Sequence, residues 1–425
     1  MARKMKDSGI EWIGEIPEGW EITKIKHIVS SVTDTDHFMP DSAEFGIPYL
    51  MIGDLKDLSS SIDWDSSKKI SIEDYKKLSI KSRPQIGDII FARYASIGTT
   101  CYIDTDRDFL VSYACLTIHP SDLIIGKFLS YYLKSSSFAE DVLRRTNSNT
   151  QGNVGKDSLV NATIVLPSII EQTQIVNFLD AKCSDINAML SKTRSSIEEY
   201  KKLKQAVITQ AVTKGVRGER EIKESKLPWA SKIPKAWNIC AIRHIMFECK
   251  ERTKDGHEEQ LSVTQQFGII KSSDASIANP SLSLDDWRIV AIGDIVFNKY
   301  KAHSGVFFVS PFSGIVTFNY SVYRCFPNCY AKYFEYQYKT HGCISEFRTR
   351  MHGVGNSISP LYTKDLMKIK VVCPPLDEQK EIANYLDAKC AEIDRLIAKK
   401  EQLVKELESY KKSLIYEVVT GKREV

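Results

Sequence analysis

Residues 171–186 read EQTQIVNFLDAKCSDI, and residues 378–393 read EQKEIANYLDAKCAEI. Ten of the sixteen positions are identical at a constant offset of 207, and the register holds without a gap to Thr213 and Thr420. Neither copy contains glycine or proline over this length, so each predicts one long helix or two abutting helices. Two matched helical segments in one chain predict an internally symmetric body.

The beginning of each half repeats as well. IEWIGEIPEGWEI starts at Ile10 and LPWASKIPKAWNI at Leu227, so that Trp20 aligns with Trp237 at an offset of 217. We therefore predict a framework that is shared by two tandem domains. Two equivalent histidines, which we expect to pack in this framework, are His27 and His244.

The same succession of elements then follows in both halves. GDIIFARY (87–94) and GDIVFNKY (293–300) predict strands, because β-branched and aromatic residues favour extended chain. Further segments match in order at offsets that differ only by loop insertions, which predicts a tandem duplication. These are β-branched segments at 111–118 and 316–324, aromatic helices at 127–134 and 332–339, and short strands that end at Pro167 and Pro374.

The long helices carry an interrupted heptad pattern, which predicts that they pack on each other antiparallel rather than on separate domains. Ser168 and Glu171 fit a capping box at the first helix start, and Pro374-Pro375 precede the second. The expected seam positions are Ile186, Met189, Tyr200, Leu203 and Val207 in the first helix and Ile393, Leu396, Leu403, Leu407, Tyr410 and Leu414 in the second.

These features predict an α+β protein with two α/β recognition domains, separated by two long antiparallel helices that form a coiled coil with an internal pseudo-two-fold repeat. An antiparallel pair of equal helices would hold one variable domain at each end. The predicted boundaries are 1–167 for the first domain, 168–215 for the first helix, 216–374 for the second domain and 375–425 for the second helix.

The composition is that of a globular protein, with 43% hydrophobic and 26% charged residues. The sequence contains no run of about 18 apolar residues, so no membrane span is predicted. The first twenty residues lack the apolar core and cleavage site of a secretory signal, so we expect a cytoplasmic protein. The net charge of +4 neither requires nor excludes nucleic acid, because phosphate binding depends on local basic patches.

The ten cysteines do not predict a metal site. Cys325 and Cys329 have no second close pair, whereas structural zinc sites need four ligands at recognisable spacing. Cys183 and Cys390 occupy equivalent helical positions, where a small apolar side chain packs well. We expect the cysteines to be reduced and structural.

No catalytic motif stands out. The sequence holds no glycine-rich phosphate loop, no nucleophile elbow and no His-Glu-x-x-His. Residues 279–282 (NPSL) lack the second proline and the aromatic of an adenine methyltransferase motif. We therefore expect that the chain is not an enzyme.

Basic, amide and aromatic residues instead follow the strands of both variable domains. Arginine and lysine suit guanine edges and phosphates, and asparagine and glutamine suit adenine edges, although solvated loops would have a similar composition. The candidate DNA-binding residues are Arg93, Tyr94, Ser96, Arg145, Asn147, Asn149, Gln151 and Asn153 in the first half and Lys299, Tyr300, Lys301, His303, Arg348, Arg350 and Asn356 in the second.

The chain resembles the specificity subunits of type I restriction–modification systems. The features that match are the IPEGW-like start of each half, GDIIFARYASIG, the helix openings of the form PxxEQ…IxxFLDxK, and the helix ends VTKG and VTGK. Together they cover nearly the full length. In the second half, KAHSG replaces YASIG, so the pattern is less complete there.

The resemblance implies two target recognition domains, each reading one half of a split, asymmetric sequence in double-stranded DNA. It also implies that the helices dock two methyltransferase subunits, which are joined by restriction and translocase subunits. No cofactor is expected on this chain, because S-adenosylmethionine, Mg²⁺ and ATP would bind the partner subunits. Candidate docking residues, for which intramolecular salt links are the alternative, are Asp180, Lys182, Asp387 and Lys389.

Two other functions stay open. The chain could be the recognition portion of a fused restriction–methylation enzyme, although its N-terminus argues against a truncated fusion. It could also be a coiled-coil adaptor that does not bind DNA, although the chemistry of its loops argues against this.

Overall fold

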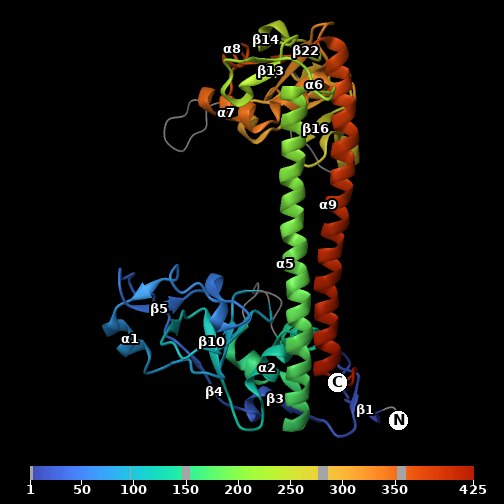
Figure 1. Cartoon of the computed structure of the whole chain (residues 1–425). Coiled ribbons are helices and arrows are strands. Elements are labelled where there is room, and N and C mark those ends of the chain that lie inside the picture. Colours follow the sequence, from blue (N-terminus) through green and yellow to red (C-terminus); the bar gives the residue numbers. More distant parts are fainter. Residues whose placement is uncertain (1–2, 96, 146–153, 276–285, 352–359) are drawn as a thin grey trace. The chain divides into compact units, whose positions relative to one another are not determined.

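The computed structural model divides into two compact units. Unit 1 comprises residues 1–194 and 402–425, and unit 2 comprises residues 195–401. Each unit combines one α+β head with parts of the same two long helices, α5 (Ile169–Lys214) and α9 (Leu376–Val419) (Figure 1). The four-segment division expected from the sequence stays a prediction. The structure describes residues 3–95, 97–145, 154–275, 286–351 and 360–425.

The head of unit 1, here head 1, is built on a four-stranded antiparallel sheet. Its strands lie in the order β4-β10-β7-β8. The central strand β7 is buried at all four positions, as the apolar run in GDIIFARY predicts. The bounds are β4 (Val29–Asp34), β10 (Cys115–Pro120), β7 (Ile89–Ala92) and β8 (Thr100–Tyr102).

The head of unit 2, here head 2, contains the same sheet. Its order is β15-β22-β19-β20, again antiparallel, so the strand order of head 1 recurs, as a tandem duplication predicts. The bounds are β15 (Met246–Cys249), β22 (Tyr320–Cys325), β19 (Ile295–Asn298) and β20 (Phe307–Val309).

The smaller sheets distinguish the heads. Head 1 pairs β5 (Ile47–Leu50) with β6 (Lys69–Ile70) and, in parallel, with β9 (Leu110–Val111). Head 2 pairs β18 (Arg288–Val290) with β21 (Gly314–Val316), and it carries a hairpin. The hairpin consists of β16 (Leu261–Thr264) and β17 (Gly268–Lys271).

The remaining elements recur in pairs, and the predicted short strands and aromatic helices are confirmed. In each head one strand pair lies near the start of the half, a second pair leads into the long helix, and two helices follow the four-stranded sheet. These elements are β3 (Glu21–Lys24) with β11 (Thr163–Leu166), β14 (Asn238–Ala241) with β23 (Lys370–Cys373), α2 (Gly126–Leu133), α6 (Ala331–Tyr338), α3 (Ser136–Arg145), α7 (His341–Arg350), β1 (Met5–Asp7) with β2 (Glu15–Pro17), and β12 (Ile222–Glu224) with β13 (Lys232–Pro234).

The segments of α5 and α9 within each unit pack antiparallel, as predicted. In unit 1, Lys411 donates to Asn187 at 2.9 Å, and Arg194 pairs with Glu408. As the residue number rises along α5 it falls along α9, which defines the direction. In unit 2, Lys204 Nζ lies 2.6 Å from an oxygen of Asp394.

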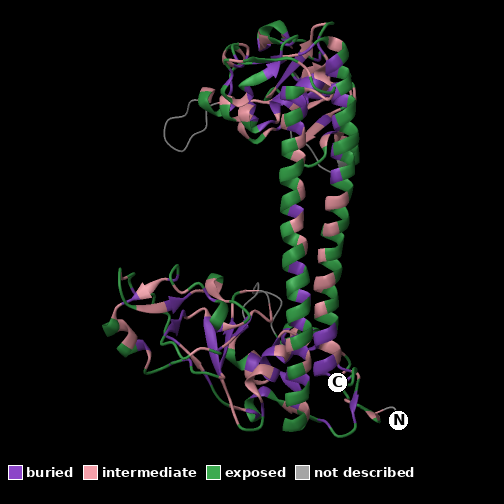
Figure 2. Cartoon of the chain, viewed as in Figure 1, coloured by how far each residue is buried: buried purple, intermediate pink, exposed green. Residues whose placement is uncertain are grey.

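The predicted seam is wrong at four of its positions. Ile186 and Ile393 are buried, but Met189, Leu203, Leu403 and Tyr410 are exposed. The buried positions on α5 instead include Cys183, Ile186, Leu190 and Ile197, a stripe that Figure 2 shows along the helix. These positions are spaced by three, four and seven residues, so the buried face is a heptad seam in which Leu190, rather than the predicted Met189, follows Ile186. The outer turns of both helices also pack against a head.

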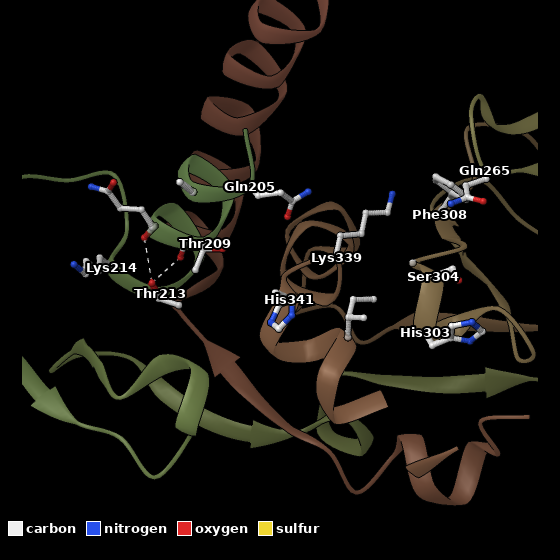
Figure 3. Close-up of a pocket in the computed structure, with 14 residues that line it drawn as sticks. Gln205, Thr209, Thr213, Lys214, Gln265, His303, Ser304, Phe308, Lys339 and His341 are labelled. Atoms are coloured by element: carbon white, nitrogen blue, oxygen red, sulfur yellow. Dashed lines mark hydrogen bonds between the residues drawn. The ribbon is translucent and has the colours of Figure 1, made fainter. Parts of the chain in front are cut away.

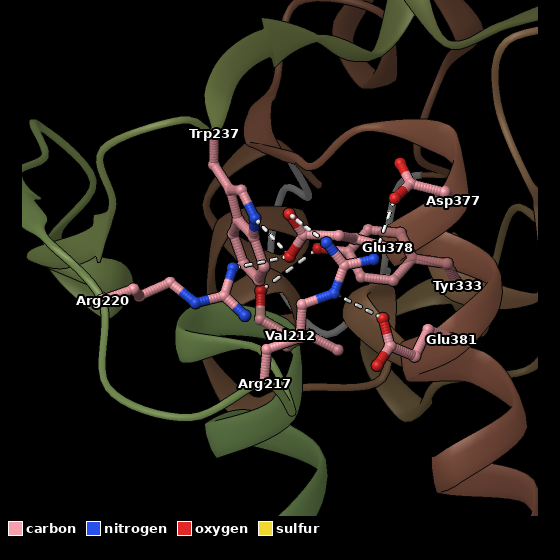
Figure 4. Close-up of polar contacts among 8 residues, drawn as sticks. All are labelled: Val212, Arg217, Arg220, Trp237, Tyr333, Asp377, Glu378 and Glu381. Carbon is pink, nitrogen blue, oxygen red and sulfur yellow. Dashed lines mark hydrogen bonds and ion pairs between the residues drawn. The ribbon is translucent and has the colours of Figure 1, made fainter.

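A buried carboxylate fastens head 2 to the start of α9 (Figure 4). Glu378 is 7% exposed, and its Oε2 accepts from Trp237 Nε1 at 3.0 Å and from Arg220 at 2.6 Å. Arg217 adds an ion pair to Asp377 at 2.8 Å and one to Glu381 at 2.7 Å. A buried charge needs such partners to offset the loss of its hydration, so the cluster fixes the helix start against the head.

Head 1 has the same fastening in reduced form. Trp20 Nε1 donates to Glu171 at 3.0 Å, and Arg3 pairs with the same carboxylate. Burial raises the pKa of Glu171, but the hydrogen bonds from Trp20 and Ser168 and the charge of Arg3 outweigh this and hold it below its usual value. The bonds between Ser168 and Glu171 confirm the predicted capping box.

The glutamine next to each carboxylate explains the rest of the repeated EQ motif. Gln172 accepts from the backbone N–H of Ile125 at 2.8 Å, and Gln379 accepts from that of Tyr330 at 2.7 Å. Each amide satisfies a backbone group at the start of α2 or α6. The motif therefore fixes the long helix to the head through two adjacent side chains.

Two other expectations have different outcomes. His27 and His244 are exposed at the ends of short 3₁₀ helices, so the prediction that they pack in the framework is wrong. All ten cysteines are free, and Cys183 and Cys390 are each 5% exposed within the helical packing. No helix in the described part of the chain is long and apolar enough to cross a membrane.

Candidate nucleic-acid interface

In head 1, the end of β7 presents the first candidate residues. Arg93 follows the strand with its side chain only 14% exposed, and its guanidinium lies 3.7 Å from Asp34 and 5.7 Å from the centre of the Tyr94 ring. Tyr94 is 44% exposed. At the end of the buried strand β7, the largely buried guanidinium of Arg93 thus lies beside the exposed ring of Tyr94.

The end of β19 repeats this arrangement in head 2. Lys299 is partly buried and donates to the Phe318 carbonyl at 3.4 Å, whereas Tyr300 is 48% exposed. Burial lowers the pKa of Lys299, and the positive charge of Arg288 lowers it further. An approaching anion would reverse part of that shift, because an opposite charge favours the protonated amine.

The helix that leads to the second candidate loop packs on the same strand in both heads. The ring of Phe138 on α3 meets that of Phe91 on β7 at 5.9 Å, edge to face. On α7, Phe347 meets Phe297 of β19 at 5.8 Å in the same orientation. Such aromatic pairs fix the helix against the sheet.

In each head, one backbone hydrogen bond joins a residue after the second candidate loop to the residue at the beginning of the first. Val154 N–H donates to the Arg93 carbonyl at 3.0 Å, and Leu361 N–H donates to the Lys299 carbonyl at 2.9 Å. The chain that follows the second candidate loop is therefore joined to the residue that begins the first. We call the region around Arg93 and Tyr94 in head 1, and around Lys299 and Tyr300 in head 2, the basic-aromatic edge of that head.

The remaining described candidates differ in their freedom. Arg145 is held by Asp141 at 3.0 Å and Arg350 lies 3.9 Å from Glu346, whereas Arg348 and Lys301 are exposed. His303 is partly buried and its Nδ1 has no hydrogen-bond partner among the described atoms. The candidates that lie outside the described residues are Ser96, Asn147, Asn149, Gln151, Asn153 and Asn356.

The sequence reasoning missed an aromatic residue at each edge. Tyr113 and Phe318 lie at an offset of 205, just before the strands β10 and β22. Tyr113 contacts His37 with ring centroids 4.7 Å apart, and Phe318 is 62% exposed. The repeat alignment of residues 111–118 with 316–323 carried the signal, because both segments hold an aromatic at the third position.

The candidate docking residues have contacts within their own units. Asp180 accepts from Lys127 at 2.7 Å and from Tyr131 at 2.8 Å, and Asp387 accepts from Tyr336 at 2.6 Å. Both aspartates thus tie a long helix to its head. The other two candidates, Lys182 and Lys389, are exposed on α5 and α9, where Lys389 pairs with Glu392; their docking role stays a prediction.

The arrangement as a whole suits nucleic acid. Each edge offers a cation, an exposed aromatic ring and a neighbouring aromatic, the groups that contact phosphates, sugars and bases. Within the described residues no group of three or more His, Cys, Asp or Glu side chains could hold a metal ion. The fold and these edges define a protein with two similar α+β heads, each of which packs on part of the same two long helices.

The comparison with known families agrees with this description. The family described as type I restriction modification DNA specificity domain matches residues 17–199 and 266–407. The chain belongs to this family of type I specificity subunits, and the resemblance drawn from the sequence is confirmed.

Relatives match over nearly the whole chain. The MjaX specificity subunit assigned to a type I restriction enzyme of Methanocaldococcus jannaschii is 27% identical, over 96% of this chain and 95% of its own length. The MjaVIII specificity subunit of the same organism is 22% identical, over 96% and 93%.

Solved structures share the fold. A chain from a study of complex assembly and conformational transition in a type I restriction–modification system has a TM-score of 0.69 at 15% identity, covering 96% of this chain and 99% of its own. The HsdS subunit from Thermoanaerobacter tengcongensis has a TM-score of 0.51 at 16% identity, covering 96% and 98%. The predicted fold class is confirmed.

Proposed function

We propose that each head of this specificity subunit reads one half of a split, asymmetric DNA sequence. The observation that carries the proposal is the basic-aromatic edge, which recurs at equivalent strand ends in surroundings that differ. Arg93 beside Asp34 and Lys299 beside Phe318 present different chemistry to a DNA groove. Equivalent frames with different edges would read different bases.

The long helices would dock two methyltransferase subunits, one on each repeat. The support is the repeat itself: Lys182 and Lys389 stand at equivalent, exposed positions on α5 and α9. One partner surface can thus meet two similar helical surfaces. Restriction and translocase subunits would join this core, and S-adenosylmethionine, Mg²⁺ and ATP would bind the partners. The expected cytoplasmic location stays a prediction.

The test substitutes one exposed tyrosine at a time. Tyr94→Ala should weaken recognition of one half-site, and Tyr300→Ala should weaken recognition of the other, because each ring belongs to one edge. Methylation sequencing of cells that express the chain with its methyltransferase partner would score both half-sites. Ile72→Ala and Ile222→Ala, which are exposed apolar positions away from the edges, serve as controls for head 1 and head 2.

The outcomes separate the three functions considered. Equal loss at both half-sites after either tyrosine substitution would contradict reading by two independent heads. Methylation or cleavage of DNA by the purified chain alone would support the fused enzyme. Failure of the assembled complex to bind DNA would support the adaptor.

A further inference from the structure

Unit 2 contains a cleft of about 1030 Å³ in addition to its basic-aromatic edge (Figure 3). One wall is the C-terminal part of α5, from Gln205 to Lys214, and the other comes from head 2. The head contributes residues 303–305, Phe308, and Lys339 with the beginning of α7. The lining residues all lie within unit 2.

The lining is cationic and rich in amides. Of the fourteen lining residues, all of them in the described part of the chain, two are lysines, two are histidines, three are glutamines and none is acidic. Lys214, the last residue of α5, is exposed and has no ion-pair partner among the described residues. His341 is exposed across the cleft. This chemistry selects an anion with several hydrogen-bond acceptors.

Lys339 contributes less free charge than Lys214. Its Nζ donates to Glu335 at 2.6 Å and lies 4.0 Å from the centre of the Phe308 ring. Burial lowers the pKa of Lys339, and the charge of Glu335 offsets part of that effect. The charge of Lys339 is therefore largely neutralised within the unit, whereas Lys214 and His341 are exposed to a ligand.

The hairpin of β16 and β17 adds an amide at the rim. Thr264 Oγ1 donates to the Gly268 carbonyl at 3.2 Å and accepts from the Phe267 N–H at 3.0 Å, which ties the two ends of the turn together. The turn residues Gln265 and Gln266 are exposed, and Gln265 lines the cleft.

The cleft is continuous in sequence with the basic-aromatic edge of head 2. His303 lines the cleft and lies two residues after Lys301, which is exposed at that edge. Its Nδ1 is buried and has no hydrogen-bond partner among the described atoms. A polyanion that reaches the edge can therefore extend into the cleft, whereas a small anion would leave most of the volume empty.

Unit 1 differs at the equivalent place. Lys134, the counterpart of Lys339, pairs with Asp57 at 2.8 Å, and Lys411 lies 3.6 Å from the same carboxylate. A smaller cavity of about 300 Å³ there is lined by both Asp57 and Asp180. The three lysines of that lining, Lys127, Lys134 and Lys411, are paired with these aspartates, whereas Lys214 in unit 2 has no ion-pair partner among the described residues, so the two units are not equivalent in this respect.

We infer that the cleft of unit 2 binds the phosphodiester backbone of duplex DNA next to the half-site that head 2 reads. The inference rests on the proposed function, because it assigns the phosphate contacts that would accompany reading by head 2. Lys214 and His341 would contact phosphates from opposite walls, and Gln265 would donate from the rim. Such contacts position a duplex without reading its sequence.

The test measures DNA binding by the full chain, assembled with its methyltransferase partner, as a function of KCl. Lys214→Gln should reduce the magnitude of the slope of log K against log[KCl] by about 1, because one lost phosphate contact releases about one counterion fewer. The methylated motif should not change. Lys223→Gln, an exposed lysine on β12 of the same unit, is the matched control and should leave the slope unchanged.

A second variant brings an opposite charge into the cleft. His341→Asp should weaken binding to target and to unrelated duplex by the same factor, with an unchanged melting temperature. An unchanged salt slope in Lys214→Gln, or a changed motif in either variant, would overturn the cleft assignment while leaving the proposed function intact. Failure of the wild-type complex to bind any duplex would overturn the proposed function, and this inference with it.

Discussion

Units 1 and 2 share a framework but differ where each head meets the long helices. Trp20 with Glu171 in unit 1 corresponds to Trp237 with Glu378 in unit 2, with the same 3.0 Å indole bond. Beside this fastening, Lys134 pairs with a head-specific loop at Asp57, whereas its counterpart Lys339 pairs within its own helix. The residues that fasten each head to its helix are therefore the same in both units, whereas the surfaces beside them differ.

The largest expected effect tests the two fastenings against each other. Glu378→Gln should lower the unfolding free energy of unit 2 by about 3–5 kcal/mol, because the largely buried guanidinium of Arg220 would lose its carboxylate partner. Glu171→Gln should cost unit 1 less, since Glu171 is 30% exposed and Glu378 only 7%. Urea unfolding followed by hydrogen exchange in each unit would measure both. Equal losses would contradict the difference in burial.

The glycine that ends each helix gives the next comparison. Gly421 has φ +74° and Gly215 has φ +81°, so alanine at either site should cost about 1–2 kcal/mol from the left-handed backbone. Gly421→Ala should cost more, because its Cβ would lie 2.3 Å from the ring of Pro17, whereas Gly215→Ala would first meet the flexible Arg220. Thermal unfolding of the two variants would rank them. The reverse order would show that the end of α9 shifts freely.

The pH dependence of stability should distinguish the units. Burial raises the pKa of Glu335, but Lys339 and Lys332 outweigh it and hold the pKa below its usual value of 4.5. Stability from a lowered carboxyl pKa is present above about pH 4.5 and is lost as the pH falls through the folded-state pKa.

The variant Glu335→Gln should therefore be less stable than the wild type at neutral pH, with a difference that narrows below pH 4.5. Unit 1 has Ser130 at the equivalent position and should show no contribution from it. Hydrogen exchange in each unit between pH 3.5 and pH 7 would measure this. A constant difference across that range would contradict the assignment.

The smallest effect concerns an exposed pair on the helices. Lys204 meets Asp394 in unit 2, whereas its counterpart Lys411 meets Asn187 in unit 1. Asn187→Asp would give unit 1 the ion pair of unit 2, and we expect a gain of less than about 1 kcal/mol because such pairs are solvated. Chemical denaturation in low and high salt would measure it. A larger gain in unfolding free energy that salt does not reduce would contradict the expectation that the new ion pair is exposed to solvent.

Most of the shared secondary-structure elements could be predicted from the sequence, because an internal repeat can be recognised without knowing which residues are in contact. The long helices, the strands at 87–94 and 293–300, and the capping box at Ser168 were predicted from local patterns and are confirmed. The helix seam was predicted less well. Met189 and Leu190 both fit a heptad that contains Ile186, and the local pattern does not reveal that Leu190 is the buried one.

The sequence by itself determined the duplication, the elements in each half and the basic-aromatic residues at the strand ends. Tertiary structure alone decided which residues meet: Asp180 with Tyr131, Glu378 with Arg220, and Lys214 with His341 across one cleft. Secondary structure follows from propensity and periodicity over a few neighbours in the chain. Charge pairing and cavities join residues far apart in the chain, such as Asp57 and Lys411, so they depend on packing that the sequence pattern does not display.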